Sequence, residues 1–244
     1  MTEPALSIII ITLNEQQRLP FLLEDLAAQS WVNFEVIHVD SNSDDETLAR
    51  SREASAFFAN YRIVEMKKRG VSLGRNVGAN LARGKRLLFL DADTRLSPEF
   101  LERAVQSLDQ SAAEVGVVCM SAEGLGLHYR IGFALFNAGI RATSRFFPTA
   151  IGACLFSTPS MHRQIGGFDE QLNLCEDCNY VLKAHHIEKR KVAVLEPKFR
   201  FDPRRLQQDG FFTTGLVYLR ANVRRFFVGE LRNQEIPYAF GHYR

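Results

Sequence analysis

The chain has 244 residues, 46% of them hydrophobic, which is enough for one large α/β domain or two small ones and excludes disorder as its main state. Thirty basic and 28 acidic residues leave a formal net charge of +2, which excludes a general nucleic-acid binder. Four cysteines are too few for a disulfide scaffold, so reduced thiols are expected.

The N-terminal half alternates predicted strands with predicted helices. Apolar runs predict strands at 7–12, 35–39, 62–66 and 87–90. Helical spacing and caps predict helices at 18–28, 43–57 and 73–81, and a fourth that starts after Ser97. The helix at 43 is expected to open with a capping box formed by Ser43 and Glu46. This alternation predicts a parallel, right-handed, doubly wound sheet.

The second half does not continue this regular alternation of strands and helices. After a strand at 115–120, residues 123–148 show no clean period and predict an irregular excursion. The remaining predicted elements are a strand at 153–157, a short helix at 159–165, a turn at 166–169, a helix at 176–188 and a strand at 191–195. No linker is evident, so we expect one domain over 1–244, divided into a nucleotide-binding half (6–120), an acceptor half (121–196) and a basic aromatic extension (197–244).

The run from Arg86 to Thr94 is the most informative feature of the chain. An apolar strand delivers Asp91, Ala92 and Asp93 to its carboxyl end, where open α/β sheets bind their ligands. Two neighbouring carboxylates repel each other unless a cation or donor groups lie between them, and hard divalent cations prefer oxygen ligands. The sequence therefore predicts a metal that carries phosphate oxygens.

Other motifs occur around this one in a fixed order. They are Thr12-Leu13-Asn14-Glu15, Asp40-Ser41-Asn42-Ser43, the run 70–79 with Arg75, Gly166-Gly167-Phe168-Asp169-Glu170, and Glu176-Asp177. Over residues 6–195 this set resembles the inverting family 2 glycosyltransferases. The resemblance implies a GT-A fold, which is a Rossmann-like, mostly parallel sheet flanked by helices, and a nucleotide-diphosphate sugar as the donor.

The resemblance also implies roles for individual residues. Thr12, Asn14 and Glu15 would contact the base and ribose, Asp91 the ribose, and Asp93 a Mn²⁺ or Mg²⁺ ion. The Asp40 carboxylate suits the N3–H of uracil or a ribose hydroxyl, and the Arg75 guanidinium suits the base or the pyrophosphate. The expected donor-binding set is Thr12, Asn14, Glu15, Asp40, Ser43, Arg75, Asp91, Ala92 and Asp93.

Asp177 is the expected catalytic base, because inversion requires a carboxylate that deprotonates the acceptor hydroxyl. Its place at a predicted helix start favours the ionised form. Glu176 is the rival for this role. The family usually carries a further acidic residue two positions after the base, whereas this chain has Asn179.

Two departures from the family bear on the product and the location. The only tryptophan is Trp31, so the Gln-x-x-Arg-Trp motif of processive members is missing and a single transfer is expected. The sequence shows no signal peptide and no long uncharged apolar stretch. We therefore expect a cytoplasmic protein, soluble or peripheral to the inner face of a membrane, with a saccharide or lipid-linked acceptor.

Several alternatives stay open. The basic aromatic segment 199–225 is either a surface for anionic membrane or a lipid phosphate, or an amphipathic helix that covers the sheet. Cys175 and Cys178 are either ordinary thiols, a redox pair, or zinc ligands together with His185 and His186. The rival functions are a sugar nucleotidyltransferase and a noncatalytic protein that binds a sugar nucleotide.

Overall fold

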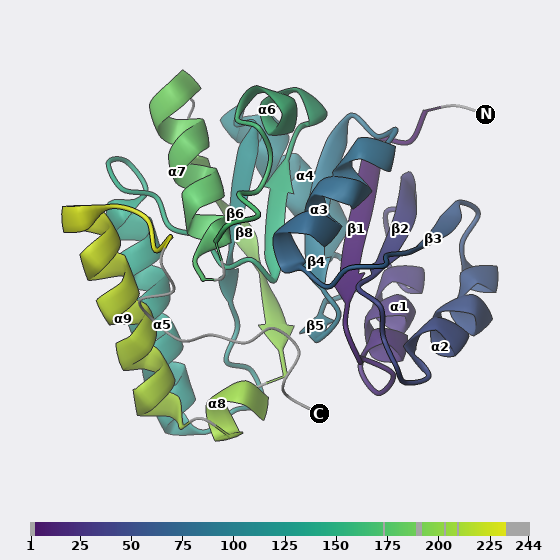
Figure 1. Cartoon of the computed structure of the whole chain (residues 1–244), viewed down its shortest axis with the longest axis horizontal. Helices are drawn as coiled ribbons and strands as arrows, with labels where there is room; N and C mark the ends of the chain where they lie inside the picture. Colours follow the sequence, from purple (N-terminus) through teal and green to yellow (C-terminus); the bar gives the residue numbers. More distant parts are fainter. Residues whose placement is uncertain (1–2, 173, 189–191, 203, 209, 233–244) are drawn as a thin grey trace.

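The computed structural model describes residues 3–172, 174–188, 192–202, 204–208 and 210–232. Its strands are β1 (Leu6–Thr12), β2 (Phe34–Asp40), β3 (Tyr61–Glu65), β4 (Arg86–Asp91), β5 (Thr94–Arg95), β6 (Val115–Met120), β7 (Cys154–Ser157) and β8 (Val192–Phe201). They form one sheet in the order β3-β2-β1-β4-β7-β6-β8-β5 (Figure 1). The expectation of a mostly parallel central sheet is confirmed: β3, β2, β1 and β4 run parallel, and β7 is the antiparallel insert.

Helices cover both faces of the sheet. The α-helices are α1 (Leu19–Ala27), α2 (Thr47–Ala54), α3 (Val71–Leu81), α4 (Phe100–Ser111), α5 (Leu127–Thr143), α6 (Pro159–Gln164), α7 (Glu176–Glu188), α8 (Arg204–Gln208) and α9 (Phe211–Val228), and a 3₁₀ turn, η1 (Ser55–Phe57), follows α2. Alternate residues of β1 enter different cores, because successive strand side chains point to opposite faces. Ile8 and Ile10 pack with α1 and α4, whereas Ile9 and Ile11 pack with α3, α6 and α7.

The irregular excursion expected at 123–148 is wrong, since most of it is the helix α5. Buried Phe133 and Ile140 lie on one side of this helix, and exposed Ile131 and Leu135 lie on another. Both sides are apolar, so the contrast between a polar and an apolar face that marks most surface helices is missing.

Two predicted helix starts are also wrong. α2 begins at Thr47, because the Ser43 hydroxyl donates to Asp40 instead of capping a helix. α4 begins at Phe100, whose N–H bonds the Ser97 carbonyl oxygen across a turn. The last strand runs beyond the predicted 191–195 to Phe201, with a register shift that accommodates Pro197, while Lys191 lies outside the described residues.

Gly78 allows α3 to approach β1 closely. A Cβ at this position would lie 2.3 Å from Ile9 Cγ2, whereas a Cβ at Gly139 in α5 would meet nothing within 4 Å. We expect Gly78→Ala to lower the free energy of unfolding by about 1–3 kcal/mol, as overpacking does in tight cores. Gly139→Ala, the matched control, is expected to be neutral or stabilising by up to about 1 kcal/mol. Urea unfolding of the two variants measures both effects, and equal stabilities would contradict the close approach.

Candidate active site

The predicted site residues meet at one edge of the sheet. In the register of β1, Thr12 pairs with Asp40 of β2, and Ile11 pairs with Asp91 of β4. The two carboxylates therefore follow strands on either side of β1, at the carboxyl ends where a nucleotide site is expected.

The loops after β1 and β2 are joined by hydrogen bonds. The Asn14 N–H donates to Ser43 Oγ at 2.9 Å, and the Asp44 N–H donates to Asn14 Oδ1 at 2.9 Å. The Glu15 N–H donates to Thr47 Oγ1 at 2.8 Å. Asn14 has a φ of 60°, a left-handed conformation that asparagine tolerates. The structure thus brings Asn14, Glu15 and Ser43 into one loop pair.

Thr12 and Asp40 belong to a buried hydrogen-bond chain that also contains His38. The Thr12 hydroxyl donates to Asp40 Oδ2 at 2.8 Å and lies 2.8 Å from His38 Nε2. Nδ1 of His38 lies 2.6 Å from Ser51 Oγ. Burial lowers the pKa of His38 to about 4, so the imidazole is neutral near pH 7. Because the Thr12 hydroxyl donates to Asp40, it can only accept from His38, which places the imidazole proton on Nε2. Asp40 is fully buried, and Ser43 supplies two further hydrogen bonds to its carboxylate.

Arg75 is almost completely buried and joins two parts of the site. Its guanidinium donates to Asp91 Oδ1 at 2.9 Å, to Glu176 Oε1 at 2.8 Å and to the Gly152 carbonyl oxygen at 3.0 Å. The neighbouring carboxylates raise its already high pKa, although burial acts in the opposite direction. These contacts favour a positioning role for Arg75 over the direct contact with base or pyrophosphate expected from sequence.

The turn at Gly166 and Gly167, which we call the glycine turn, positions Phe168 against Arg75. Gly166 and Gly167 have φ values of 74° and 68°, which side chains rarely adopt. The Asn76 side chain accepts from the Phe168 N–H and donates to the Phe168 carbonyl oxygen, which fixes the end of this turn. The Phe168 ring then lies 5.1 Å from the Arg75 guanidinium carbon, within the range of a cation–π contact.

Asp177 lies in the first turn of α7 and is partly buried. Its Oδ1 accepts from the Cys178 N–H at 2.7 Å. Burial, together with the charge of Glu176, raises the pKa of Asp177 to about 6, although Arg75 and Arg225 act to lower it. The expectation that a helix start favours the ionised form is therefore outweighed by burial, and the carboxylate is mainly ionised only above pH 6.

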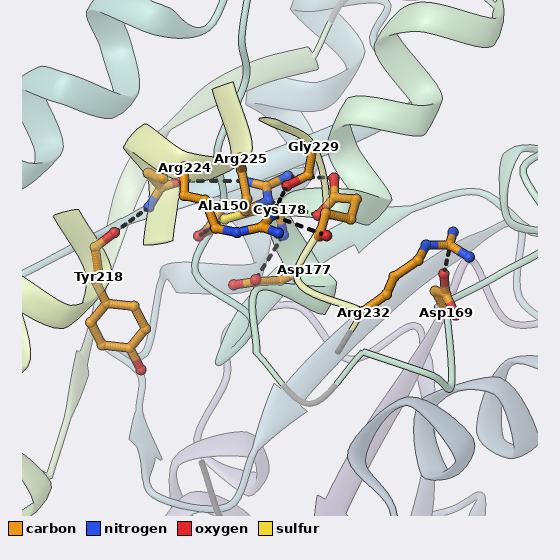
Figure 2. Close-up of polar contacts among 11 residues, drawn as sticks. Ala150, Asp169, Asp177, Cys178, Tyr218, Arg224, Arg225, Gly229 and Arg232 are labelled. Carbon is orange, nitrogen blue, oxygen red and sulfur yellow. Dashed lines mark hydrogen bonds and ion pairs between the residues drawn. The ribbon is translucent and has the colours of Figure 1, made fainter. Parts of the chain in front are cut away.

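The C-terminal helix α9 contributes Arg225 to this region. Figure 2 shows Arg225 beside Asp177 and Cys178. The Arg225 guanidinium is held by both carboxylate oxygens of Glu230, at 2.8 and 2.9 Å. A second ion pair, between Arg232 and Asp169 at 3.1 Å, joins the chain after α9 to the glycine turn (Figure 2). Segment 199–225 therefore contributes directly to the site.

A second carboxylate lies opposite Asp93. β5 and β8 pair antiparallel, with Thr94 opposite Phe201, so Asp93 faces Asp202, and the Asp202 N–H bonds the Asp93 carbonyl oxygen at 3.0 Å. Both residues line the same two cavities. Within the described part of the chain, no three His, Cys, Asp or Glu side chains gather to hold a metal by themselves. Two carboxylates fit Mn²⁺ or Mg²⁺ that arrives with substrate phosphates, because such ions need only one or two protein ligands.

One cavity joins these groups. Its charged end is lined by Arg75, Asp91, Asp93, Glu176, Asp177 and Asp202. Its walls are largely apolar and include Phe133 and Phe136 of α5 and Phe211 and Tyr218 of α9. Thr12, Asn14, Glu15, Asp40 and Ser43 do not line it, and Ala92 lines a neighbouring cavity shared with Asp93. The structure therefore brings Asp91, Asp93 and Asp177 to one cavity, whereas Thr12 and Asp40 end the strands β1 and β2, and Asn14, Glu15 and Ser43 lie on the loops after these strands.

Two contributors to the site were missed from the sequence, His38 and Asp202, whereas Arg225 belongs to the basic aromatic segment 199–225 that the sequence singled out. His38 carried a signal, since it stands within a predicted strand that ends at the site. The zinc interpretation of Cys175 and Cys178 finds no support, because no metal-ligand group forms among the described residues. Both cysteines are buried, and the thiol pKa of Cys178 is raised by a hydrogen bond with Cys175 and by burial.

A sheet edge that gathers carboxylates at the carboxyl ends of its strands is typical of the ligand-binding edge of an α/β protein. The family model described as "Glycosyl transferase family 2" matches residues 7–157, more than half of the chain. The chain therefore belongs to glycosyl transferase family 2.

Individual proteins show the same similarity. An uncharacterised glycosyltransferase of Haemophilus influenzae is 39% identical over 106 residues, which cover 43% of this chain and 35% of that protein. S. aureus TarS in complex with UDP-GlcNAc superposes with a TM-score of 0.63 at 23% identity, over 80% of this chain and 57% of TarS. The mannosyltransferase PcManGT of Pyrobaculum calidifontis, in complex with GDP-Man and Mn²⁺, superposes with a TM-score of 0.67 at 20% identity, over 81% of this chain and 56% of PcManGT. These structures confirm the GT-A fold. The chain spans about a third of the curated relative's length.

Proposed function

We propose that the protein transfers a single sugar, with inversion, from a nucleotide-diphosphate sugar to a hydroxyl of a saccharide or lipid-linked acceptor. One observation supports this proposal: Asp91, Asp93 and Asp177 line a single cavity. An inverting transfer needs a base on the side of the sugar opposite the leaving diphosphate, and we propose that Asp177 takes this position while Asp91 and Asp93 face the diphosphate. We propose a cytoplasmic location for the reaction, as expected from the sequence.

Asp177 is proposed as the base. Its Oδ1 is occupied by the Cys178 N–H, so Oδ2 would take the proton of the acceptor hydroxyl. Glu176 is less suited, because its Oε1 is bound to Arg75. Arg75 would hold Asp91 and the start of α7 at a fixed separation, since it contacts both.

Asp93, with Asp202 opposite, would hold Mn²⁺ or Mg²⁺. The ion would act as a Lewis acid that neutralises charge on the departing diphosphate. Arg18 donates to Asp202 at 2.6 Å and keeps this carboxylate directed toward the loop after β1. The donor would lie along that edge, with its nucleoside against Thr12, Asn14, Glu15, Asp40 and Ser43.

A uridine diphosphate sugar is the proposed donor. TarS is recorded with UDP-GlcNAc, whereas PcManGT is recorded with GDP-Man, so the fold accepts either base. Asp40 would act on the base through Thr12 and Ser43, because its own carboxylate is fully buried and already accepts hydrogen bonds from both residues.

A thermal-shift panel of nucleotide sugars, with and without Mn²⁺, tests the proposal. One UDP-sugar at about 100 times its Kd should raise Tm by about 5–10 °C in the presence of the metal. Asp93→Asn should remove the metal-dependent part of the shift, whereas Asp109→Asn, an exposed carboxylate on α4, should leave it intact. A shift without hydrolysis or transfer would favour the noncatalytic alternative, and pyrophosphate release from a nucleoside triphosphate with a sugar phosphate would favour a nucleotidyltransferase.

A further inference from the structure

The outward face of α9 is apolar instead of polar. The residues that recur at helical spacing on this side are all exposed: Phe212, Leu216, Leu219, Val223, Phe226 and Phe227. Phe212 is 81% exposed and Phe227 77%. A soluble helix normally turns such side chains inward, and here Thr214, Ala221 and Arg225 are buried in their place.

α5 shows the same inversion. Its exposed stripe contains Leu127, Ile131, Ala134, Leu135, Ala138 and Ala142, and Phe146 follows just beyond its end. Leu127 is 68% exposed and Leu135 69%. Contiguous apolar surface of this extent marks an interaction site.

The two stripes form one surface. α5 and α9 lie side by side (Figure 1), and they run parallel, because Phe211 at the start of α9 packs on Gly132 near the start of α5 while Phe226 contacts Phe147 after its end. Each helix keeps its buried residues toward the protein, so both stripes point away from it. We call this surface the α5–α9 face.

The charged side chains of α5 and α9 are all basic. Neither helix contains an aspartate or glutamate, whereas Arg130, Arg141, Arg145 and Arg220 are exposed at the flanks of the α5–α9 face. None of the described helices is long and apolar enough to cross a membrane. An apolar stripe bordered by arginines, on helices that do not span, is typical of a surface that lies in the interface of an anionic bilayer.

We propose that the α5–α9 face docks the protein on a lipid bilayer that contains anionic lipids. Its phenylalanine and leucine side chains enter the boundary between headgroups and acyl chains, and its arginines contact lipid phosphates. The same two helices wall the cavity that leads to Asp177, so docking places the active site beside the bilayer. The proposal goes beyond the transfer reaction and does not depend on it.

Vesicle flotation of the full chain provides the test. We expect binding at low salt to vesicles of phosphatidylcholine mixed with phosphatidylglycerol, and binding about tenfold weaker or less to phosphatidylcholine alone. High salt should weaken binding to the mixed vesicles and leave binding to phosphatidylcholine alone unchanged, because salt screens only the electrostatic contribution.

Matched variants locate the surface. Phe227→Asn should weaken binding to the mixed vesicles by about tenfold or more, since it removes an aromatic side chain from the interface. Phe57→Asn makes the same change at a 65% exposed phenylalanine in η1, on another part of the molecule, and should have no effect. Arg220→Gln should weaken binding by about fivefold, and only to vesicles with anionic lipid. Circular dichroism melting should be unchanged in all three.

Three results would overturn the proposal. The first is no binding to anionic vesicles at low salt, and the second is an equal loss in Phe57→Asn and Phe227→Asn. The third is a lipid-free dimer, seen by light scattering, that Phe227→Asn dissociates while vesicle binding is unaffected, because a second copy of the chain would then cover the face.

Discussion

Asp177→Asn is expected to lower kcat by about 10²–10⁴-fold while the nucleotide sugar still binds, because the substitution removes a proton acceptor without changing the side chain's size. The Cys178 N–H can still bond the amide oxygen, so the first turn of α7 should keep its geometry. Coupled release of the nucleoside diphosphate measures kcat, and the thermal shift measures donor binding. Full activity in this variant would remove Asp177 from the mechanism.

The pH profile provides the companion measurement. Because the pKa of Asp177 is about 6, a rise in proton concentration below this pH neutralises the base, so kcat/KM of the native enzyme should fall tenfold per pH unit there. We call this fall below pH 6 the acid limb of the profile. Glu176→Gln removes a neighbouring negative charge, so it should lower the pKa of Asp177, move the acid limb to lower pH and keep most of the native kcat. If Glu176→Gln abolished turnover and Asp177→Asn did not, the two roles would be exchanged.

Arg75→Met is expected to lower the free energy of unfolding by about 3–5 kcal/mol, the usual cost of removing one partner from a buried ion pair. Asp91 and Glu176 would lose their shared cation, and the Gly152 carbonyl oxygen would lose a donor. Denaturant unfolding measures the loss. Arg52→Met, at an arginine whose side chain is 60% exposed, is the control and should change stability by about 0–1 kcal/mol.

A second readout separates positioning from stability alone. Arg75 lowers the pKa of Asp177, so its removal should raise that pKa and move the acid limb of kcat/KM to higher pH. Arg75→Lys keeps the charge without the forked geometry and should move the limb less. An unchanged limb in both variants would restrict Arg75 to a structural role.

The sheet was predictable because its strands carry continuous apolar runs. Ile8 to Ile11 and Leu87 to Leu90 are buried on both faces, and short apolar runs of this kind, bounded by polar loop residues, are typical of strands in a parallel sheet. Because ligands bind at the carboxyl ends of such strands, the strand ends alone predicted that Thr12, Asp40, Asp91 and Asp93 lie at one edge of the sheet.

The misses have physical causes. α5 was missed because exposed leucine and isoleucine on its outer face hide the helical period, the same property that makes the α5–α9 face. Ser43 was misread because a serine followed by Glu46 has the pattern of a capping box, whereas the buried Asp40 carboxylate competes for its hydroxyl and its N–H.

The remaining site residues depend on contacts between distant parts of the chain. The burial of Arg75 follows from Glu176, which lies 101 positions away, and local sequence predicts only an exposed arginine on a helix. Asp202 reaches Asp93 through the pairing of β5 with β8, and a two-residue strand leaves almost no periodic signal. Arg225 lies near Asp177 because α9 packs alongside α5.

The hydrogen bonds that join the loops after β1 and β2 have a thermodynamic consequence. Asn14, Glu15 and Ser43 are already held by side-chain and backbone partners before a nucleotide arrives. Binding of a nucleotide at this loop pair would therefore immobilise few additional torsion angles, so less of the interaction energy would be lost to conformational entropy. If this loop pair holds the nucleoside, as we propose, its affinity therefore depends little on ordering of the loops.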